Sequence, residues 1–550
     1  MKRVDPGLLS RRQWLGVLGA LPAACVPSAL RPPRCYVGSA GDPSCRELLW
    51  SYNSMDHSRS TVLRPLDLAD LRRTLMEFPL RGRRLTFRGG GASLDRQSLN
   101  DDTVILLDNP SFATVNIDLD DPCGPTLTVG AGATWQQVLD HTLPLGLVPY
   151  CTPSASFVRI GGGLAANSFS RMSARWGREE RYLRQFTLVG PDGRIYDCHP
   201  GQSPASLEYK LFHAVPGAQG YLGVVTRARY ALRRIAPAGS PLCVRTETRV
   251  QTLGRGVQGN ETVRNYLRDL RFESKHLPPD APLGCPPVPE DDGNPETPDG
   301  IFGTLWWARD VCRTMRGLIG RTKYLPESHV GKPRGLLNRR DSFLRVFGEY
   351  GFVEPGGEAS FQDINYHLSN CDPLSYDPVD DFAFFQDADA RAKRYAEPRW
   401  RMTAAEQAYC IHPDRAGEFL EALDYEVRLV EHYPALVDLL YAPRDLRHHP
   451  LSATSDDRTM VFTVAYLDRN GERWACSQAM YRTLAAHCAR LGGKVYLGKT
   501  VEAEVADLDA MWCAGVHELR ALKRQVDRHG LIANEFWDRN LGCLTPLGAL

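Results

Sequence analysis

The chain has 550 residues, of which 43% are hydrophobic and 24% are charged, and its 66 basic residues almost balance its 65 acidic ones. This balance gives no electrostatic support for nucleic-acid binding or for binding to an acidic membrane surface. The composition is typical of a globular protein, and the length favours two domains. Beyond the N-terminal region, no apolar run of about 18 residues predicts a membrane-spanning helix.

The first 30 residues have the features of an export signal. Ser10–Gly16 reads S-R-R-Q-W-L-G, close to the twin-arginine pattern S-R-R-x-F-L-K, and a short apolar stretch follows. We therefore expect export to the periplasm by the twin-arginine route, which carries folded proteins. Two outcomes stay open at Leu21–Cys25: simple cleavage, or acylation of Cys25, which would attach the protein to a membrane. Residues 31–45 are rich in Pro, Gly and Ser and are predicted to form a linker.

The 15 cysteines include no C-x-x-C pair, so the sequence indicates neither a zinc ribbon nor a thioredoxin-type site. No other metal-ligand spacing is present, and no metal is expected. Cys35 and Cys45 flank a short loop and could form a disulfide after export. Cys243, Cys410 and Cys488 lie in apolar runs, and we expect them to be buried as small hydrophobic residues.

Between residues 46 and 235, short apolar runs alternate with turn residues, which predicts an α/β region rich in strands. Asp67 is placed to cap a helix that carries Leu68, Leu71 and Leu75. Pro191–Gly193 joins two β runs and predicts a hairpin. The predicted strands are Leu85–Arg88, Thr103–Leu107, Thr126–Val129, Phe186–Val189, Arg194–Cys198 and Val224–Leu232, and a helix is predicted at Trp135–Leu143.

Two glycine-rich stretches dominate this region. Arg84–Ser93 is a short apolar strand that runs into three glycines, and Ile160–Asn167 reads I-G-G-G-L-A-A-N. Glycine adopts positive φ at little cost and carries no Cβ, and consecutive backbone N–H groups in such turns bind anions. We expect the stretches to be two loops that hold a phosphate-bearing cofactor from two sides. Neither matches the nicotinamide fingerprint or a P-loop.

The composition changes after residue 236. Residues 277–300 contain eight prolines and several acids, which predicts an exposed loop or lid. We interpret the segment up to residue 493 as an α+β substrate domain, after which the chain returns to the first region. The predicted strands are Ala383–Phe385, Ala404–Ile411, Met460–Tyr466 and Val495–Tyr496, and helices are predicted at Arg415–Val430, Ser477–Leu491 and Ala514–Val526.

Several motifs follow one another in a recognisable order. They are Phe87–Ser93, Val129–Trp135, Cys151–Pro153, Ile160–Gly163, Phe186–Gly193 and Gly217–Val225. In this order they resemble the FAD-binding domain of the vanillyl-alcohol oxidase / p-cresol methylhydroxylase (PCMH-type) flavoproteins. The likeness resumes at Gly493–Lys499 and Leu522–Asp527, where a Tyr-Leu-x-Lys run resembles the decaprenylphosphoryl-ribose oxidase branch.

The resemblance implies an α+β fold: a PCMH-type FAD-binding domain of two α/β lobes, and an α+β substrate (cap) domain. The expected division is a signal at 1–30, a linker at 31–45, the FAD-binding domain at 46–235, the substrate domain at 236–493 and a segment at 494–550 that returns to the flavin.

FAD is the cofactor that the resemblance implies, and we expect it to be bound non-covalently. Relatives with a covalent flavin carry a histidine after the first glycines, where this chain has Ala92, or a cysteine just upstream of the second glycine pair. Cys151 lies ten residues before Gly161, further than that link requires. Ser168 and Phe169 stand where the ribose-oxidase branch has a histidine. The expected flavin contacts are Arg88, Gly89, Gly90, Gly91, Ala92, Ser93, Ser154, Arg159, Ile160, Gly161, Gly162, Ala166, Asn167, Val225 and Tyr496.

Lys499 is the expected catalytic residue, because by resemblance its ammonium lies at the flavin and would stabilise negative charge on the reduced ring. Tyr496 and Lys499 have opposite parity on a strand, so both can reach the site only if the strand bulges or ends between them. Gln407 and Tyr409 share one strand face and are expected to orient the substrate, with a purely structural role for Tyr409 as the alternative. His448 and His449 could include a base, although a solvated pair is the simpler reading.

These features predict an FAD-linked oxidase or dehydrogenase that passes a hydride from a CH–OH group of a sugar, alditol or polyprenyl-linked sugar to flavin N5. Two alternatives stay open. One is a flavin-dependent C=C reductase, because Asp387–Arg394 resembles a segment of the sterol Δ24-reductase-like branch. The other is a flavin-binding protein without turnover. The sequence identifies neither the small-molecule or lipid-linked substrate nor the electron acceptor.

Overall fold

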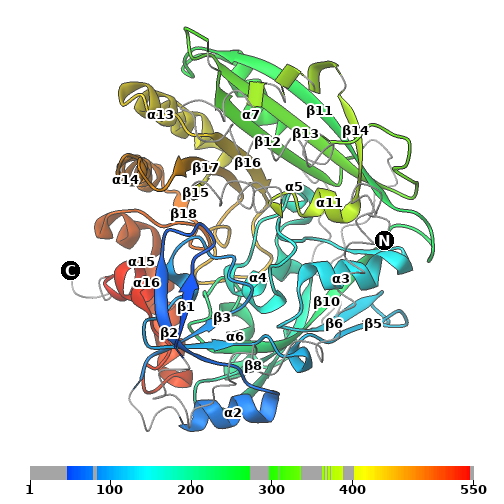
Figure 1. Cartoon of the computed structure of the whole chain (residues 1–550), viewed down its shortest axis with the longest axis vertical. Coiled ribbons are helices and arrows are strands. Elements are labelled where there is room, and N and C mark those ends of the chain that lie inside the picture. The colour runs from blue at the N-terminus through cyan, green and yellow to red at the C-terminus, as the bar shows by residue number, and fades with distance from the viewer. Residues whose placement is uncertain are drawn as a thin grey trace, which may run out of the picture.

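The computed structural model describes residues 46–77, 83–272, 297–308, 310–335, 362–363, 366–367, 369–371, 373–387 and 402–544. The export signal, the linker, Cys25, Cys35 and Cys45 lie outside these residues, as do most of the proline-rich loop and the stretch after Asp387. The chain forms three β-sheets with helices around them, so the expected α+β class is confirmed. Figure 1 shows the largest sheet above the other two.

The first sheet has four strands in the order β1 (Arg46–Trp50), β2 (His57–Leu63), β4 (Thr103–Leu106) and β3 (Leu85–Arg88). β4 pairs in parallel with both β2 and β3. Helix α2 (Leu68–Glu77) buries Leu71 and Leu75, and the Asp67 carboxylate accepts the backbone N–H of Asp70 at 2.8 Å. The predicted helix cap is therefore confirmed, and β3 begins and ends as predicted.

The second sheet is antiparallel and its strands run β5 (Val115–Asp118), β6 (Thr126–Gly130), β10 (Val224–Arg234), β8 (Leu183–Val189) and β9 (Ile195–Cys198), with β7 (Leu147–Pro149) also pairing with β10. The hairpin of β8 and β9 confirms the predicted turn at Pro191–Gly193. Around this sheet lie α3 (Trp135–Thr142), α4 (Ile160–Ala166) and α6 (Leu207–Ala214), whereas α5 (Ser173–Trp176) packs against the third sheet.

The third sheet has eight strands and carries the upper half of the molecule in Figure 1. Their order is β14 (Leu374–Pro378), β11 (Cys243–Gly254), β13 (Met315–Leu325), β12 (Gly300–Trp307), β16 (Leu436–Ala442), β17 (Thr459–Arg469), β15 (Met402–Ile411) and β18 (Lys494–Val495). The helices α7 (Glu261–Asp269), α13 (Ala416–Leu429) and α14 (Trp474–Arg490) pack around it, with α7 against β13 and α14 against β15.

After β18 the chain returns to the first two sheets. The long helix α15 (Val505–Val526) is followed by α16 (Glu535–Trp537), and between them the carbonyl of Leu531 accepts the backbone N–H of Leu85 at 2.8 Å. The Tyr221 hydroxyl donates to Asn534 at 2.8 Å. Residues from both ends of the chain therefore stabilise the lower half of the molecule.

Two sequence expectations are wrong. Residues 383–385 are not a strand, because α11 (Val379–Ala383) begins after Pro378 with Asp380 and Asp381 in its first turn, a pattern that favours a helix start. Ile160–Asn167 is not a loop, because Ile160–Ala166 forms α4 and Asn167 ends it at φ 47°. Helix α15 also begins earlier than predicted.

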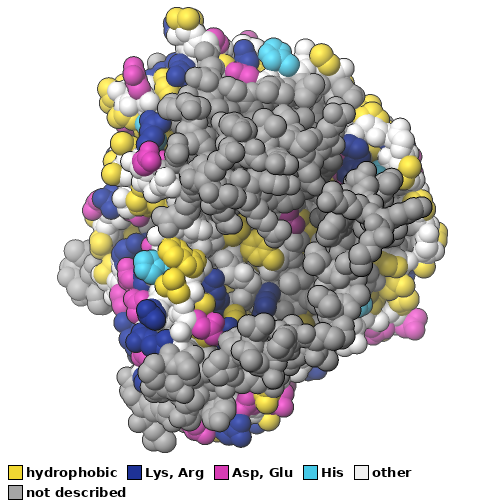
Figure 2. All heavy atoms as spheres, viewed as in Figure 1, with side chains coloured by type: hydrophobic (Ala, Val, Ile, Leu, Met, Phe, Trp, Pro, Cys, Tyr) yellow, Lys and Arg dark blue, Asp and Glu magenta, His cyan; other side chains and the backbone are white. Residues whose placement is uncertain are grey.

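The cysteines mostly behave as the sequence indicates. Cys243, Cys410 and Cys488 are free and buried, as predicted, and Cys123 is disulfide-bonded. Within the described ranges, no helix is long and apolar enough to cross a membrane. Along the coloured margin of the face in Figure 2, positive and negative side chains are interspersed, in keeping with the balanced charge.

Candidate functional site

A large pocket lies where the three sheets approach one another. Its walls come from the Gly89–Ser93 loop after β3, from α4 and the segment before it, from the face of the eight-stranded sheet, and from the turn after β18. It holds about 1590 Å³ of empty space, part of it open to solvent. A ligand held in this pocket would therefore contact both the glycine loop and the large sheet.

The glycine loop after β3 exposes its main chain to this pocket. Gly90 lies so close to the neighbouring segment that a Cβ on it would be 2.2 Å from the carbonyl oxygen of Phe157, and Gly91 has φ 74°. Neither position therefore accepts another residue without strain. Gly89, Ala92 and Ser93 also line the pocket. Five consecutive positions thus present backbone or very small side chains to whatever occupies it.

The second glycine stretch contributes one face of a helix. Gly162 and Ala166 line the pocket, and a Cβ on Gly162 would meet no atom within 4 Å. Gly161 faces the other way, with its N–H donated to the carbonyl of Ala131 at 3.0 Å. A helix, unlike a loop, turns its residues in different directions, so only part of this stretch can reach a ligand.

Five expected flavin contacts do not line the pocket. They are Arg88, Ile160, Gly161, Asn167 and Val225. The Arg88 guanidinium points behind the loop and donates to the carbonyl of Trp50 at 2.8 Å and to Ser98 at 3.2 Å. Ile160, Asn167 and Val225 are buried, and Gly161 is half-buried with a Cβ position 3.1 Å from the Cβ of Ala131. These residues support the wall from behind, and their contact with a flavin stays a prediction.

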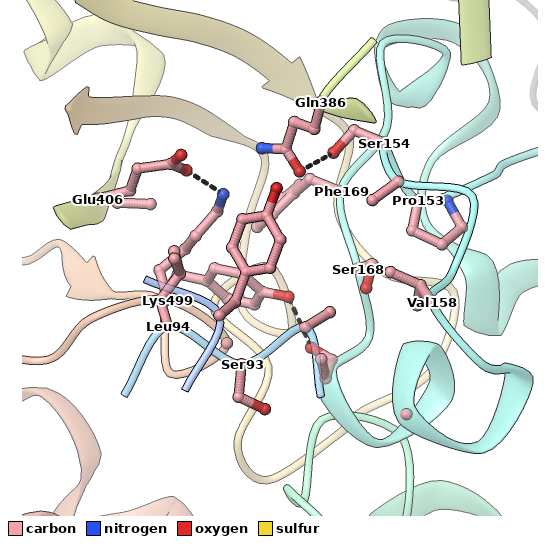
Figure 3. A pocket seen from close by; sticks show the side chains of 18 of the residues that line it. Ser93, Leu94, Pro153, Ser154, Val158, Ser168, Phe169, Gln386, Glu406 and Lys499 are labelled. Atoms are coloured by element: carbon pink, nitrogen blue, oxygen red, sulfur yellow. Dashed lines mark hydrogen bonds and ion pairs between the residues drawn. The ribbon is translucent and has the colours of Figure 1, made fainter. Parts of the chain in front are cut away.

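Ser154 and Arg159 do line the pocket. The Ser154 hydroxyl donates to the side-chain oxygen of Gln386 at 2.7 Å, a contact drawn in Figure 3. Arg159 donates to the carbonyl of Leu107, and burial lowers its pKa. Gln386, which the sequence reasoning missed, thereby ties the segment before α4 to the chain that follows α11.

Tyr496 and Lys499 reach the pocket together because β18 ends at Val495. The Tyr496 hydroxyl donates to the carbonyl of Ala166 at 2.9 Å, and burial raises its pKa to about 12. The Lys499 ammonium forms an ion pair with Glu406 of β15 (Figure 3). Gln97 fixes the main chain of the turn, because its amide donates to the carbonyls of Leu497 at 3.0 Å and Lys499 at 2.7 Å. The sequence analysis expected the strand to bulge or end between Tyr496 and Lys499, but β18 ends before both residues, so strand parity does not restrict either of them.

Gln407 and Tyr409 lie on the wrong face of β15 to touch a substrate in this pocket. Both are fully buried toward α14, where Gln407 donates to the carbonyl of Glu502 at 3.0 Å and Tyr409 donates to the carbonyl of Tyr481 at 3.1 Å. The expectation that they orient a substrate in the pocket is therefore corrected. Their neighbours Glu406 and Ala408 point into the pocket instead, as alternation along a strand requires.

The sheet face above the pocket carries acidic groups that the sequence reasoning also missed. Cross-strand register aligns Ala408 of β15, Thr463 of β17, Asp438 of β16 and Thr304 of β12 in one row. Asp438 lines the pocket and accepts the Thr304 hydroxyl at 3.2 Å. Burial raises the pKa of Asp438 to about 6, while Arg171 opposes the rise. Such a carboxylate can gain or lose a proton near neutral pH.

His448 and His449 lie away from the pocket. His448 is exposed and contacts Glu518 at 2.9 Å. His449 is buried 3.1 Å from Glu180, and these two form a compact group with Asp445 whose ligand atoms lie within 4.8 Å of one another. Although the burial of Glu180 opposes the change, the charges of His449 and nearby arginines lower the pKa of Glu180 to about 2. This is an ion network that joins the second sheet to the loop after β16.

The structure also shows where the residues lie that stand at the positions of covalent flavin links in the resembled families. Cys151 is buried behind the wall, with its thiol donated to the carbonyl of Gly177 at 3.1 Å, and burial raises its pKa strongly. Ala92, Ser168 and Phe169 all line the pocket. None of these three side chains can form a covalent bond of the histidine or cysteine type to a flavin.

Comparison with known proteins identifies part of the chain. A family model described as an FAD binding domain matches residues 60–199. Cytokinin dehydrogenase 8 of Oryza sativa subsp. indica is 34% identical over 109 residues, 20% of each chain. Cytokinin dehydrogenase 9 of Oryza sativa subsp. japonica is 30% identical over 175 residues, 31% of this chain and 32% of the relative. D-lactate dehydrogenase of Archaeoglobus fulgidus is 28% identical over 145 residues, 26% of this chain and 32% of the relative.

These matches span between a fifth and a third of the relatives' lengths. Residues 60–199 include the Gly89–Ser93 loop and α4, the two parts that form the lower wall of the pocket. The match therefore supports an FAD-binding domain over residues 60–199 of the chain.

Proposed function

We propose that this chain, whose residues 60–199 form an FAD-binding domain, is an FAD-linked oxidoreductase that passes a hydride from a substrate CH–OH group to flavin N5. The motifs resemble those of the PCMH-type flavoproteins, with the decaprenylphosphoryl-ribose oxidase branch among them, and this favours a sugar, an alditol or a polyprenyl-linked sugar as the substrate. The observation that carries the proposal is the composition of the pocket. Its lower wall lies in residues 60–199, which match the FAD-binding domain. Its upper wall, formed by the face of the eight-stranded sheet and the turn after β18, presents Lys499, Glu406 and Asp438.

The residues that would hold FAD are those of the lower wall. The Gly89–Ser93 loop offers main-chain donors at close range, and Arg159 adds a guanidinium suited to a phosphate. Bound FAD would supply the hydride acceptor. Two observations support non-covalent binding: Ala92 in the wall has no group that can link to the ring, and the buried Cys151 thiol points to the carbonyl of Gly177.

Three side chains on the upper wall would handle charge and protons. Oxidation of a CH–OH group releases a proton from the hydroxyl, and Asp438 is the carboxylate whose pKa of about 6 suits it to accept that proton. Lys499 would stabilise negative charge that develops nearby, and Glu406 holds its ammonium in place. Tyr496 stays protonated and positions the turn through Ala166.

The wider context belongs to the same proposal. Residues 46–235 and 494–550 would hold the cofactor and 236–493 the substrate, which is a small molecule or lipid-linked. Export through the twin-arginine route would deliver the folded flavoprotein to the periplasm, with acylation of Cys25 as the route to a membrane.

A spectrum of the purified chain before and after acid precipitation tests the cofactor. We expect a yellow protein whose flavin is released into the supernatant; a colourless protein that takes up no added FAD would overturn the proposal. Anaerobic bleaching by alditols, sugars or D-lactate supports CH–OH oxidation. Bleaching by a nicotinamide donor, followed by re-oxidation with an alkene, would replace it with the reductase. A flavin that none of these reagents reduces indicates a carrier.

A further inference from the structure

Arg171 lies in the pocket wall, in the segment between α4 and α5. The carbon at the centre of its guanidinium is 3.5 Å from the centroid of the Phe385 ring and 4.1 Å from that of Phe302. Both rings line the same pocket. Contacts of this kind hold an arginine in one place while leaving the N–H groups at its edge available as donors.

The position of Phe302 is built into the eight-stranded sheet. In the register of β12 and β13, Phe302 is paired with Gly320. A Cβ on Gly320 would lie 2.3 Å from the Cζ atom of Phe302, so the ring lies directly over the glycine. Any larger residue at 320 would displace the ring and, with it, the surface that supports Arg171.

The Arg171 guanidinium has neither a hydrogen bond nor an ion pair with the part of the chain that the structure describes. Asp438 and Asp377 are near enough to act on it electrostatically, but neither forms an ion pair with it. Burial lowers the pKa of Arg171 to about 10, so it stays charged at neutral pH. Arg171 is half-buried in the pocket wall, and arginines withdrawn from water are usually paired, as Arg233 is with Asp299 at 2.7 Å.

We propose that Arg171 binds an oxyanion of the substrate, either a carboxylate or a phosphate ester; this rests on the proposed function, because it names the class of molecule that the same pocket receives. The guanidinium offers parallel N–H donors that match both groups. Phe169, Leu440 and Val461 line the pocket as well, so the rest of the ligand meets an apolar surface.

Calorimetric titration of the FAD-loaded protein with three small aromatic probes tests this inference without requiring turnover. The probes are phenylacetate, phenyl phosphate and the neutral phenylacetamide, in a buffer free of other oxyanions. We expect at least one anion to bind more tightly than phenylacetamide, and the tighter anion identifies the group. Arg171→Met should weaken that anion on the order of 10- to 100-fold and leave phenylacetamide within about twofold, as expected for loss of a charge-assisted contact.

Arg313→Met is the matched control, because Arg313 also lies against an aromatic ring, 4.9 Å from the Tyr433 centroid, but outside the pocket. It should change none of the affinities. Arg171→Lys keeps the charge without the planar fork and should lie between wild type and Arg171→Met. The inference is overturned if neither anion binds the wild type more tightly than phenylacetamide, or if Arg171→Met weakens all three probes equally. FAD content and flavin reduction are measured separately, so a yellow, reducible protein without anion preference refutes only this inference.

Discussion

Replacement of Asp438 tests the chemistry most directly, because one side chain would account for both a rate and its pH dependence. The ordinary pKa of an aspartate is 3.8, and burial raises that of Asp438 to about 6. A base must be ionised to accept a proton. The rate of flavin reduction by a CH–OH donor should therefore rise with pH through this range, and an unperturbed aspartate would leave it flat above about pH 5.

The magnitude follows from the ionised fraction. With a pKa of about 6, roughly one tenth of Asp438 is ionised at pH 5 and roughly nine tenths at pH 7, so the rate should increase about ninefold between them. Asp438→Asn removes the base and keeps its shape. It should slow flavin reduction by about 10²- to 10⁴-fold and abolish the rise. The groups that face Asp438 are Arg171, Glu406, Lys499 and Thr304, and none of them is altered.

Stopped-flow absorbance under anaerobic conditions measures the reduction rate between pH 5 and pH 8. Asp424→Asn is the control, because Asp424 is a buried aspartate that accepts the indole N–H of Trp307 at 2.7 Å but lies outside the pocket. It should retain the wild-type profile. A flat wild-type profile, or an Asp438→Asn variant that keeps the rise, would show that Asp438 is not the base.

Three further predictions concern charge, the loop and stability. Lys499→Ala should stay yellow but slow flavin reduction on the order of 100-fold in stopped flow, because one charge-stabilising group is lost; an unchanged rate refutes its role. Gly90→Val should abolish FAD binding in equilibrium dialysis, because its Cβ would lie 2.2 Å from the carbonyl of Phe157, and a normal flavin content would contradict this. Burial raises the pKa of Glu179 to about 8, so the contribution of this residue to stability is lost as the pH rises from about 4.5 to about 8. The variant Glu179→Gln keeps an acceptor for the Tyr230 hydroxyl but does not titrate. Its free energy of unfolding, measured in urea, should therefore vary less with pH over this range than that of the wild type.

Local sequence rules predicted those parts of the fold whose causes are local. Asp67 caps α2, β3 runs into three glycines, and β15 and β17 appear where alternating apolar residues predict them. The same rules wrongly predicted a loop at Ile160–Asn167, because three consecutive glycines suggest a turn. Packing against the second sheet, with the Ile160 N–H donated to the carbonyl of Ala133 at 3.0 Å, makes it a helix.

The sequence of a single strand does not show which of its residues point into the pocket, so the residues of the candidate site could not all be predicted. Both faces of β15 are covered, one by α14 and the other by the pocket wall, so polarity could not tell Gln407 from Glu406. Gln407 is buried because its amide satisfies main-chain carbonyls, which is a tertiary property. Asp438 and Arg171 come from distant parts of the chain and meet only through the register of the sheet and the path between α4 and α5.

The turn that carries Lys499 is held from both halves of the molecule. Gln97, beside the glycine loop, fixes its main chain, and Glu406, on the large sheet, fixes its ammonium. If the large sheet moved away from the half that contains the glycine loop, the Lys499 turn could not keep both its contact with Gln97 and its contact with Glu406. The position of the Lys499 charge therefore depends on contacts with both halves of the molecule, and a ligand that separated them would be expected to displace it.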